Sequence, residues 1–203
     1  LNQFIQGEAI TKDLNPHYGG IQKLHARNTD LVVLCEDKCL KVLANKDALF
    51  EAGGNAQLTA TNRVLGQSIP FSGNYGISKN PESFAEYAFR MYFTDKNRGA
   101  VIRLSMDGIT PISDAGMRDF FNDNLPTADK LIGSYDTKKG AYNLTLPTTT
   151  VCFDEKINGW PSFKSFIPEA GASLNNKYFT MNQGELWIHN NAVINNFYGV
   201  QYD

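Results

Sequence analysis

Short runs rich in hydrophobic, β-forming residues recur along most of the chain, and polar turn signals separate the runs. The clearest group lies in residues 83–113 and has four runs: Ser83–Tyr87, Met91–Asp95, Ala100–Ser105 and Ile109–Ser113. Two of the turns between them end in glycine, at Gly99 and Gly108, and glycine adopts the positive φ that a tight hairpin needs. The pattern predicts a four-stranded antiparallel meander in which Met91–Asp95 pairs with Ala100–Ser105.

A similar unit recurs at three other places with altered sequence. In one copy Ile132–Tyr135 is expected to pair with Ala141–Leu146 across the turn Asp136–Gly140, which repeats the Asp-to-Gly spacing of Asp95–Gly99. Two copies turn more tightly, and their runs are Leu31–Cys35 with Cys39–Leu43 and Lys177–Met181 with Glu185–His189. The pattern therefore repeats through most of the sequence.

The spacing of the units indicates the fold. Phe93, Tyr135 and Phe179 mark the second strand of successive units and lie 42 and 44 residues apart. A period of about 40 to 45 residues with about four short strands per unit is typical of propeller blades. We therefore expect a mainly β fold of antiparallel four-stranded blades from a complete or incomplete β-propeller, with short helices in loops. Residues 1–203 would form one such segment, with units at about 21–45, 83–113, 131–166 and 171–199.

Two segments between the units differ from this pattern. Asp47–Ala52 is followed by two glycines and resembles a short helix with a glycine stop. The connection Gly53–Asn80 is rich in Gly, Asn, Ser and Thr, and only Arg63–Gln67 and Ser68–Phe71 resemble strands. Ordering a connection of this length costs conformational entropy, and the segment has few apolar residues whose burial could offset that cost. We therefore expect it to contact another protein.

A second helix is predicted over Asp114–Leu125. Met117, Phe120 and Phe121 fall at i, i+3 and i+4 and form a narrow apolar stripe. Two interpretations of the stripe remain open. It can pack on the edge of its own blade, or it can bind a partner protein.

Composition narrows the classes of function. The chain has 203 residues, 42% of them hydrophobic, and a formal net charge of −2. This is enough to bury a core, whereas the scattered charges offer no basic patch for non-specific binding to nucleic acid. The longest apolar run, Leu31–Cys35, is far shorter than the roughly 20 residues that cross a bilayer. Leu1–Ile10 lacks the sections of a signal peptide, and the first residue is not Met. We therefore expect that the chain has lost its true start, either by processing or because it is an internal piece of a longer protein.

No motif for metal binding or catalysis is recognised. The three cysteines, Cys35, Cys39 and Cys152, are an odd number, which argues against a disulfide framework. Cys35 and Cys39 flank a turn and could form a local disulfide or half a zinc site, but no ligand pair at suitable spacing completes it. The histidines His17, His25 and His189 are isolated, and the sequence contains no nucleophile elbow or phosphate-binding loop.

One loop and two aromatic residues have alternative readings. The loop that begins at Asp95 resembles the start of a calcium loop, but its twelfth position is Met106 instead of an acid, so we interpret it as a hairpin turn. Trp160 and Trp187, with loop tyrosines such as Tyr75 and Tyr198, could stack on sugars; core packing is the other reading. We expect no catalytic, cofactor-binding or metal-binding residues and no cofactor.

Several segments in order resemble those of large virion structural proteins of tailed bacteriophages, of the tail hub, nozzle or stabilisation type. These segments are Gly73–Phe84, Tyr92–Gly99, Leu104–Ser113, Gly159–Phe166, Ser173–Phe179 and Gly184–Trp187. The resemblance covers roughly residues 31–199 and implies β-propeller domains, assembly as rings around the tail channel, and no enzymatic activity. This chain is far shorter than those proteins, which implies one segment of the family protein.

The sequence therefore predicts a non-enzymatic structural component of a bacteriophage virion, located in the tail. Its expected partners are other virion proteins and copies of itself, with no membrane and with DNA contact only through a channel face. The alternatives are a carbohydrate- or surface-binding propeller and a propeller enzyme. An enzyme would need carboxylates or histidines that converge at one mouth of the propeller, whereas Asp95 and Asp136 occupy equivalent turns of separate units.

Overall fold

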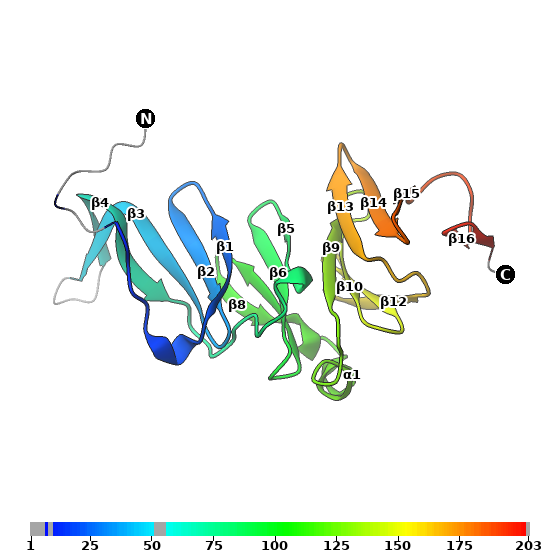
Figure 1. The fold of residues 1–203 in the computed structure, drawn as a ribbon, viewed down its shortest axis with the longest axis horizontal. Helices are drawn as coiled ribbons and strands as arrows, with labels where there is room; N and C mark the ends of the chain where they lie inside the picture. Colours follow the sequence, from blue (N-terminus) through cyan, green and yellow to red (C-terminus); the bar gives the residue numbers. More distant parts are fainter. Residues whose placement is uncertain (1–6, 8–9, 51–55, 202–203) are drawn as a thin grey trace. The chain divides into compact units, whose positions relative to one another are not determined.

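The computed structural model describes residues 7, 10–50 and 56–201. The chain forms two compact units, residues 1–77 and 78–203, and both are built from antiparallel β-sheets (Figure 1). The described part contains one α-helix, α1 (Arg118–Asn124), and no described helix has the length and apolar character that a membrane crossing requires. The mainly β prediction is confirmed.

The first unit is one four-stranded sheet. After a 3₁₀ turn, η1 (Pro16–Tyr18), the chain forms β1 (Ile21–Ala26), β2 (Asp30–Cys35), β3 (Cys39–Phe50) and β4 (Ala56–Pro70), in that spatial order. The apolar run predicted in residues 31–35 is β2, and its buried side chains pack with those of β3. β1, β2 and the first part of β3 lie within residues 21–45, and β4 adds a fourth strand to their sheet.

The predicted helix at Asp47–Ala52 is wrong for residues 47–50, and residues 51–52 lie outside the described residues. Residues 47–50 continue β3 and pair with the start of β4, in a register that runs from Lys46↔Ala60 to Phe50↔Ala56. The connection expected from Gly53 onward is likewise mostly strand, since β4 begins at Ala56. Ladder hydrogen bonds to a neighbouring strand outweigh weak local helix propensity here.

This pairing produces a projecting two-stranded ribbon, residues 46–50 and 56–60. β2 accompanies β3 only as far as the pair Asp30↔Leu43, so the ribbon strands are paired with each other and with no other described strand. The Leu58 side chain on this ribbon is 58% exposed.

The second unit contains the other sheets. The first has β5 (Ala85–Tyr87), β6 (Arg90–Asp95), β7 (Ala100–Ser105) and β8 (Gly108–Pro111), and the next has β9 (Ile132–Asp136), β10 (Ala141–Thr145), β11 (Thr150–Asp154) and β12 (Gly159–Lys164). A three-stranded sheet follows with β13 (Ala170–Leu174), β14 (Lys177–Asn182) and β15 (Glu185–Ile188), and then the short hairpin β16 (Asn196–Phe197) and β17 (Val200–Gln201). Short 3₁₀ turns, η2 (Pro81–Ser83) and η3 (Ile112–Asp114), flank the first sheet.

Both predicted strand pairings are confirmed. β6 pairs with β7 from Met91↔Leu104 to Asp95↔Ala100. β9 pairs with β10 from Ile132↔Thr145 to Asp136↔Ala141. The turn glycines Gly99 and Gly140 have φ values of +61° and +69°, so their conformation explains the shared Asp-to-Gly spacing.

The helix predicted over Asp114–Leu125 is shorter than expected. The chain forms the 3₁₀ turn η3 first, and α1 begins only at Arg118. Phe121 is fully buried, and Met117 and Phe120 pack against the same core cluster. The apolar stripe therefore packs inside its own unit, which favours the first of the two interpretations.

Consecutive sheets of the second unit meet through their first strands. β9 packs against β5 and against β13, and Figure 1 shows β9 beside β13. The approach is closest at Gly133 of β9, where a β-carbon would overlap the backbone carbonyl of Ser83. At Gly171 of β13 a β-carbon would lie 2.9 Å from the Ser134 β-carbon. Two tyrosines complete these contacts: Tyr142 donates a hydrogen bond of 2.7 Å to the Ser83 carbonyl, and the Tyr178 hydroxyl lies 2.7 Å from Ser134 Oγ.

Candidate functional site

The two aspartates at equivalent turns hold the backbone and the adjoining segments. Asp95 is fully buried, and its Oδ1 accepts hydrogen bonds from the Arg98 backbone and from Ser78 Oγ, both at 3.1 Å, while Oδ2 pairs with Arg98 Nη1 at 2.9 Å. Asp136 Oδ1 accepts from the backbone of Lys138 and Lys139 at the next turn. Each carboxylate thus accepts hydrogen bonds from the backbone of its own turn.

A second polar cluster joins the first two sheets of this unit. Glu155, in the β11–β12 turn, accepts a hydrogen bond of 2.5 Å from the Tyr92 hydroxyl and one of 3.0 Å from Arg103 Nη1. Tyr92 also stacks on Tyr135 and on Tyr142, with centroid distances of 5.5 and 5.0 Å. Burial raises the pKa of Tyr135 to about 12 and that of Tyr92 still further, with Glu155 adding to both shifts. The Tyr92 ring is fully buried, so this cluster has the geometry of an inter-sheet contact.

The candidate metal ligands do not converge. Cys35, Cys39 and Cys152 are buried free thiols, and burial raises the pKa of Cys35. Within the part of the chain that the structure describes, no three His, Cys, Asp or Glu side chains form a group that could hold a metal ion.

The two tryptophans have different environments. Trp160 packs against Phe121 and Phe153, and its indole nitrogen donates to the Ile112 carbonyl at 2.9 Å, so its role is core packing. Trp187 of β15 meets Tyr198 edge to face at 5.5 Å. The Trp187 indole nitrogen is buried and has no hydrogen-bond partner among the described residues.

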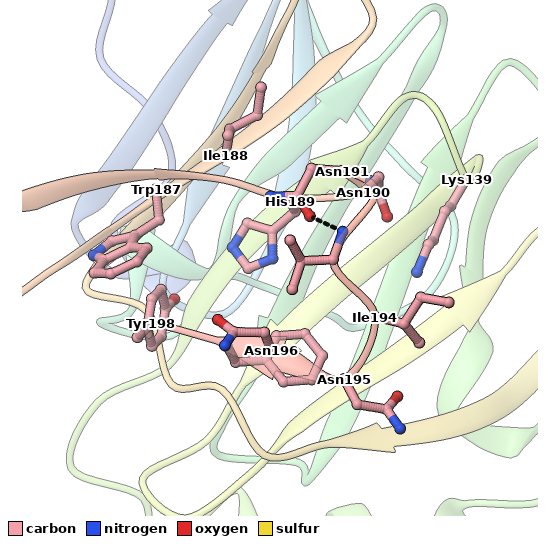
Figure 2. A pocket seen from close by; sticks show the side chains of 12 residues that line it. Lys139, Trp187, Ile188, His189, Asn190, Asn191, Ile194, Asn195, Asn196 and Tyr198 are labelled. Atoms are coloured by element: carbon pink, nitrogen blue, oxygen red, sulfur yellow. Dashed lines mark hydrogen bonds between the residues drawn. The ribbon is translucent and has the colours of Figure 1, made fainter. Parts of the chain in front are cut away.

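A cavity of about 480 Å³ lies beside Trp187 (Figure 2). Aromatic rings and side-chain amides form most of its wall, and the lysine Lys139 reaches it from the β9–β10 turn. The rings and amides belong to these residues: Trp187, His189, Asn190, Asn191, Asn195, Asn196, Phe197 and Tyr198. A volume of this size falls in the range of small-molecule sites.

A second cavity of about 260 Å³ shares Lys139, His189, Asn190 and Phe197 with the first. Lys164 lines it, donates a hydrogen bond of 2.6 Å to Asn143 Oδ1 and lies 5.5 Å from the centre of the Phe166 ring. Because burial disfavours an ammonium ion, the pKa of Lys164 is lowered. The two cavities are neighbours that share part of their walls.

His189 lines both cavities. Its Nε2 lies 2.6 Å from Thr180 Oγ1, which also lies 2.9 Å from the Tyr198 hydroxyl. Burial lowers the pKa of His189 to about 4, and the charges of Lys164 and Lys139 act in the same direction, against Asp136. The imidazole is therefore neutral at pH 7.

The shifted pKa of His189 predicts a pH-dependent stability. Since the folded-state pKa lies below the ordinary 6.5, the unfolded chain binds the proton more tightly, and stability falls as the pH drops from 6.5 toward 4. The free energy of unfolding of the unsubstituted protein should fall between pH 7 and pH 4.5. Allowing for partial solvent exposure of His189, we expect His189→Gln to make this fall smaller by about 1–2 kcal/mol. Urea unfolding followed by tryptophan fluorescence measures this, with His17→Gln as the control. An unchanged pH dependence in His189→Gln would contradict the expectation.

Sequence reasoning singled out part of this pocket. It named Trp187, Tyr198 and His189 separately but missed Lys139, Lys164 and the asparagines of residues 190–196. The cluster of four asparagines in that short stretch was the available signal. The lysines gave none, because Lys139 lies in the β9–β10 turn and Lys164 in β12, and both reach the pocket only after folding.

Comparison with known families gives the identity of the chain. The profile of the crassvirus muzzle protein family matches residues 8–184, which is most of the sequence. The chain belongs to this family. The muzzle family supports a structural component of a phage virion, as the resemblance in the sequence implied. No curated protein sequence matches the chain significantly. Trp187 and the asparagine-rich segment lie beyond the matched residues, whereas Lys139 and Lys164 lie within them.

Proposed function

We propose that this muzzle-family chain is a non-enzymatic component of the phage tail, in its hub, nozzle or connector region. It would act through protein–protein contacts in a ring-like assembly, with other virion proteins and copies of itself as partners. Assembly would take place in the host cytoplasm. The protein would contact DNA only through a surface that faces the tail channel. The family match carries this proposal.

The sheet arrangement supports a propeller-type segment. In a propeller the first strands of successive blades gather near the central axis. β5, β9 and β13 are each the first strand of a sheet, and β9 contacts both of the others. We therefore interpret the sheets of residues 1–203 as blades of one propeller-type segment within a longer protein.

The polar clusters support a role without catalysis. Tyr92 and Asp95 are fully buried, and Glu155 is occupied by Tyr92 and Arg103. A catalytic acid or nucleophile must reach its substrate. These groups instead connect neighbouring sheets and turns, as a rigid structural component requires.

The ribbon 46–50 and 56–60 is the proposed contact with a neighbouring protein. An isolated two-stranded hairpin is marginally stable in water, and Leu58 exposes apolar surface there. α1 is a weaker candidate, because it turns Phe121 into its own core. A neighbour that covers the ribbon would supply the missing burial.

Hydrogen exchange tests this contact. In the purified virion, amides of the ribbon should exchange at least about ten times more slowly than in the free chain, since a covered ribbon opens less often. Amides in the centre of β6 and β7 are the internal control and should be protected in both states. Equal exchange of the ribbon in the free and assembled states would place the contact elsewhere.

A further inference from the structure

The pocket beside Trp187 contains several polar groups that the described chain does not satisfy. The Trp187 indole N–H is buried without a partner. The side-chain amides of Asn195 and Asn196 form no hydrogen bond with the described residues, and the same holds for the Lys139 ammonium group. Asn195 and Lys139 are exposed and Asn196 is half-buried, so their polar groups face solvent and are available to a bound molecule with hydroxyl or carboxylate groups.

The backbone at this pocket departs from local preference. Tyr198 and Gly199 form the turn between β16 and β17, with φ values of +53° and +77°. Asn or Gly is the usual first residue where both central residues have positive φ, whereas a tyrosine is unfavourable there. The unfavourable conformation places the Tyr198 ring against Trp187 and its hydroxyl on Thr180. Such departures concentrate at binding sites.

The charge around the pocket is net positive. Lys138, Lys139 and Lys164 are the nearby cations, and Lys138 donates to the Asn190 carbonyl at 2.9 Å. The nearby acids are Asp136 and Glu169. Asp136 is already neutralised in part by two backbone N–H groups and by the Asn190 amide at 2.9 Å. A negatively charged ligand group is therefore favoured.

We propose that the cavity beside Trp187 binds an acidic saccharide. The ring of the sugar would lie against the Trp187 and Phe197 side chains, and its hydroxyl groups would bond to the Asn195 and Asn196 amides. Its carboxylate would pair with Lys139. Amides both donate and accept, which matches hydroxyl groups, and aromatic faces match the apolar face of a sugar ring. The site would give a virion protein a direct contact with acidic glycans.

The test is a two-dimensional ¹H–¹⁵N NMR titration of the purified chain with D-glucuronate, D-glucose and acetate. The chain has two indole N–H signals, and Trp160 serves as the internal control because its indole is bonded to Ile112. Glucuronate should shift the Trp187 signal saturably and leave that of Trp160 in place. Glucose should bind about tenfold more weakly, and acetate should not shift the Trp187 signal, because each probe lacks one half of the match.

Two variants test the role of the lysine. Lys139→Gln should weaken glucuronate binding about tenfold, whereas Lys156→Gln, an exposed lysine on the β11–β12 turn, should leave it unchanged. An immobile Trp187 signal with all three probes would overturn the proposal. If glucose and glucuronate bound with equal affinity, and Lys139→Gln did not change the binding, the proposal that the ligand is acidic would be overturned. Because the titration uses the isolated chain, its result is independent of whether the protein assembles in the tail.

Discussion

Replacing Gly133 with alanine is expected to destabilise residues 78–203 by about 3 kcal/mol or more. The added β-carbon would overlap the Ser83 carbonyl group, which is backbone and cannot rotate away. The Tyr142 hydroxyl, bonded to that carbonyl, lies 3.0 Å from the same position. The substitution must therefore push β9 away from the segment before β5 and open the core between two sheets.

Urea unfolding followed by tryptophan fluorescence measures this effect, since both tryptophans lie in residues 78–203. Gly159→Ala is the matched control, because a β-carbon there meets only the Ile157 oxygen at 3.8 Å, an ordinary contact. We expect it to change the stability by less than about 1 kcal/mol. A Gly133→Ala protein as stable as the control would show that β9 and the turn at Ser83 do not approach so closely.

Asp95→Ala is expected to cost about 3 kcal/mol. The carboxylate is fully buried and holds Ser78 Oγ, the Arg98 backbone N–H and the Arg98 guanidinium. Alanine would leave these donors without their acceptor and would fill little of the vacated space. The turn between β6 and β7 and the segment at Ser78 would both loosen.

Asp154→Ala is the matched control for Asp95→Ala. Asp154 also ends a strand before a turn, but it is partly exposed, and among the described residues its side chain bonds only the Lys156 backbone, at 2.8 Å. We expect a loss of about 1 kcal/mol or less, measured in the same urea experiment. If both variants lost the same amount, burial of Asp95 would not be the source of its effect.

The sequence predicted the regular parts of the fold because they depend on neighbouring residues. Runs of β-forming residues that flank turns with Gly99 and Gly140 at positive φ are enough to predict the hairpins β6–β7 and β9–β10. The core role of Trp160 was one of two open readings, and its contact with Phe121 decides it.

Tertiary structure decided the features that depend on residues distant in sequence. Residues 47–50 became strand because β4 supplies a ladder partner, which local propensity cannot show. Gly133 and Ser83 meet only when two sheets pack, so no turn signal marked Gly133. The pocket forms where the β9–β10 turn brings Lys139 to Trp187 and the asparagine-rich segment. Short-range patterning thus determined the strands and hairpins, while packing between sheets determined the close contacts and the site.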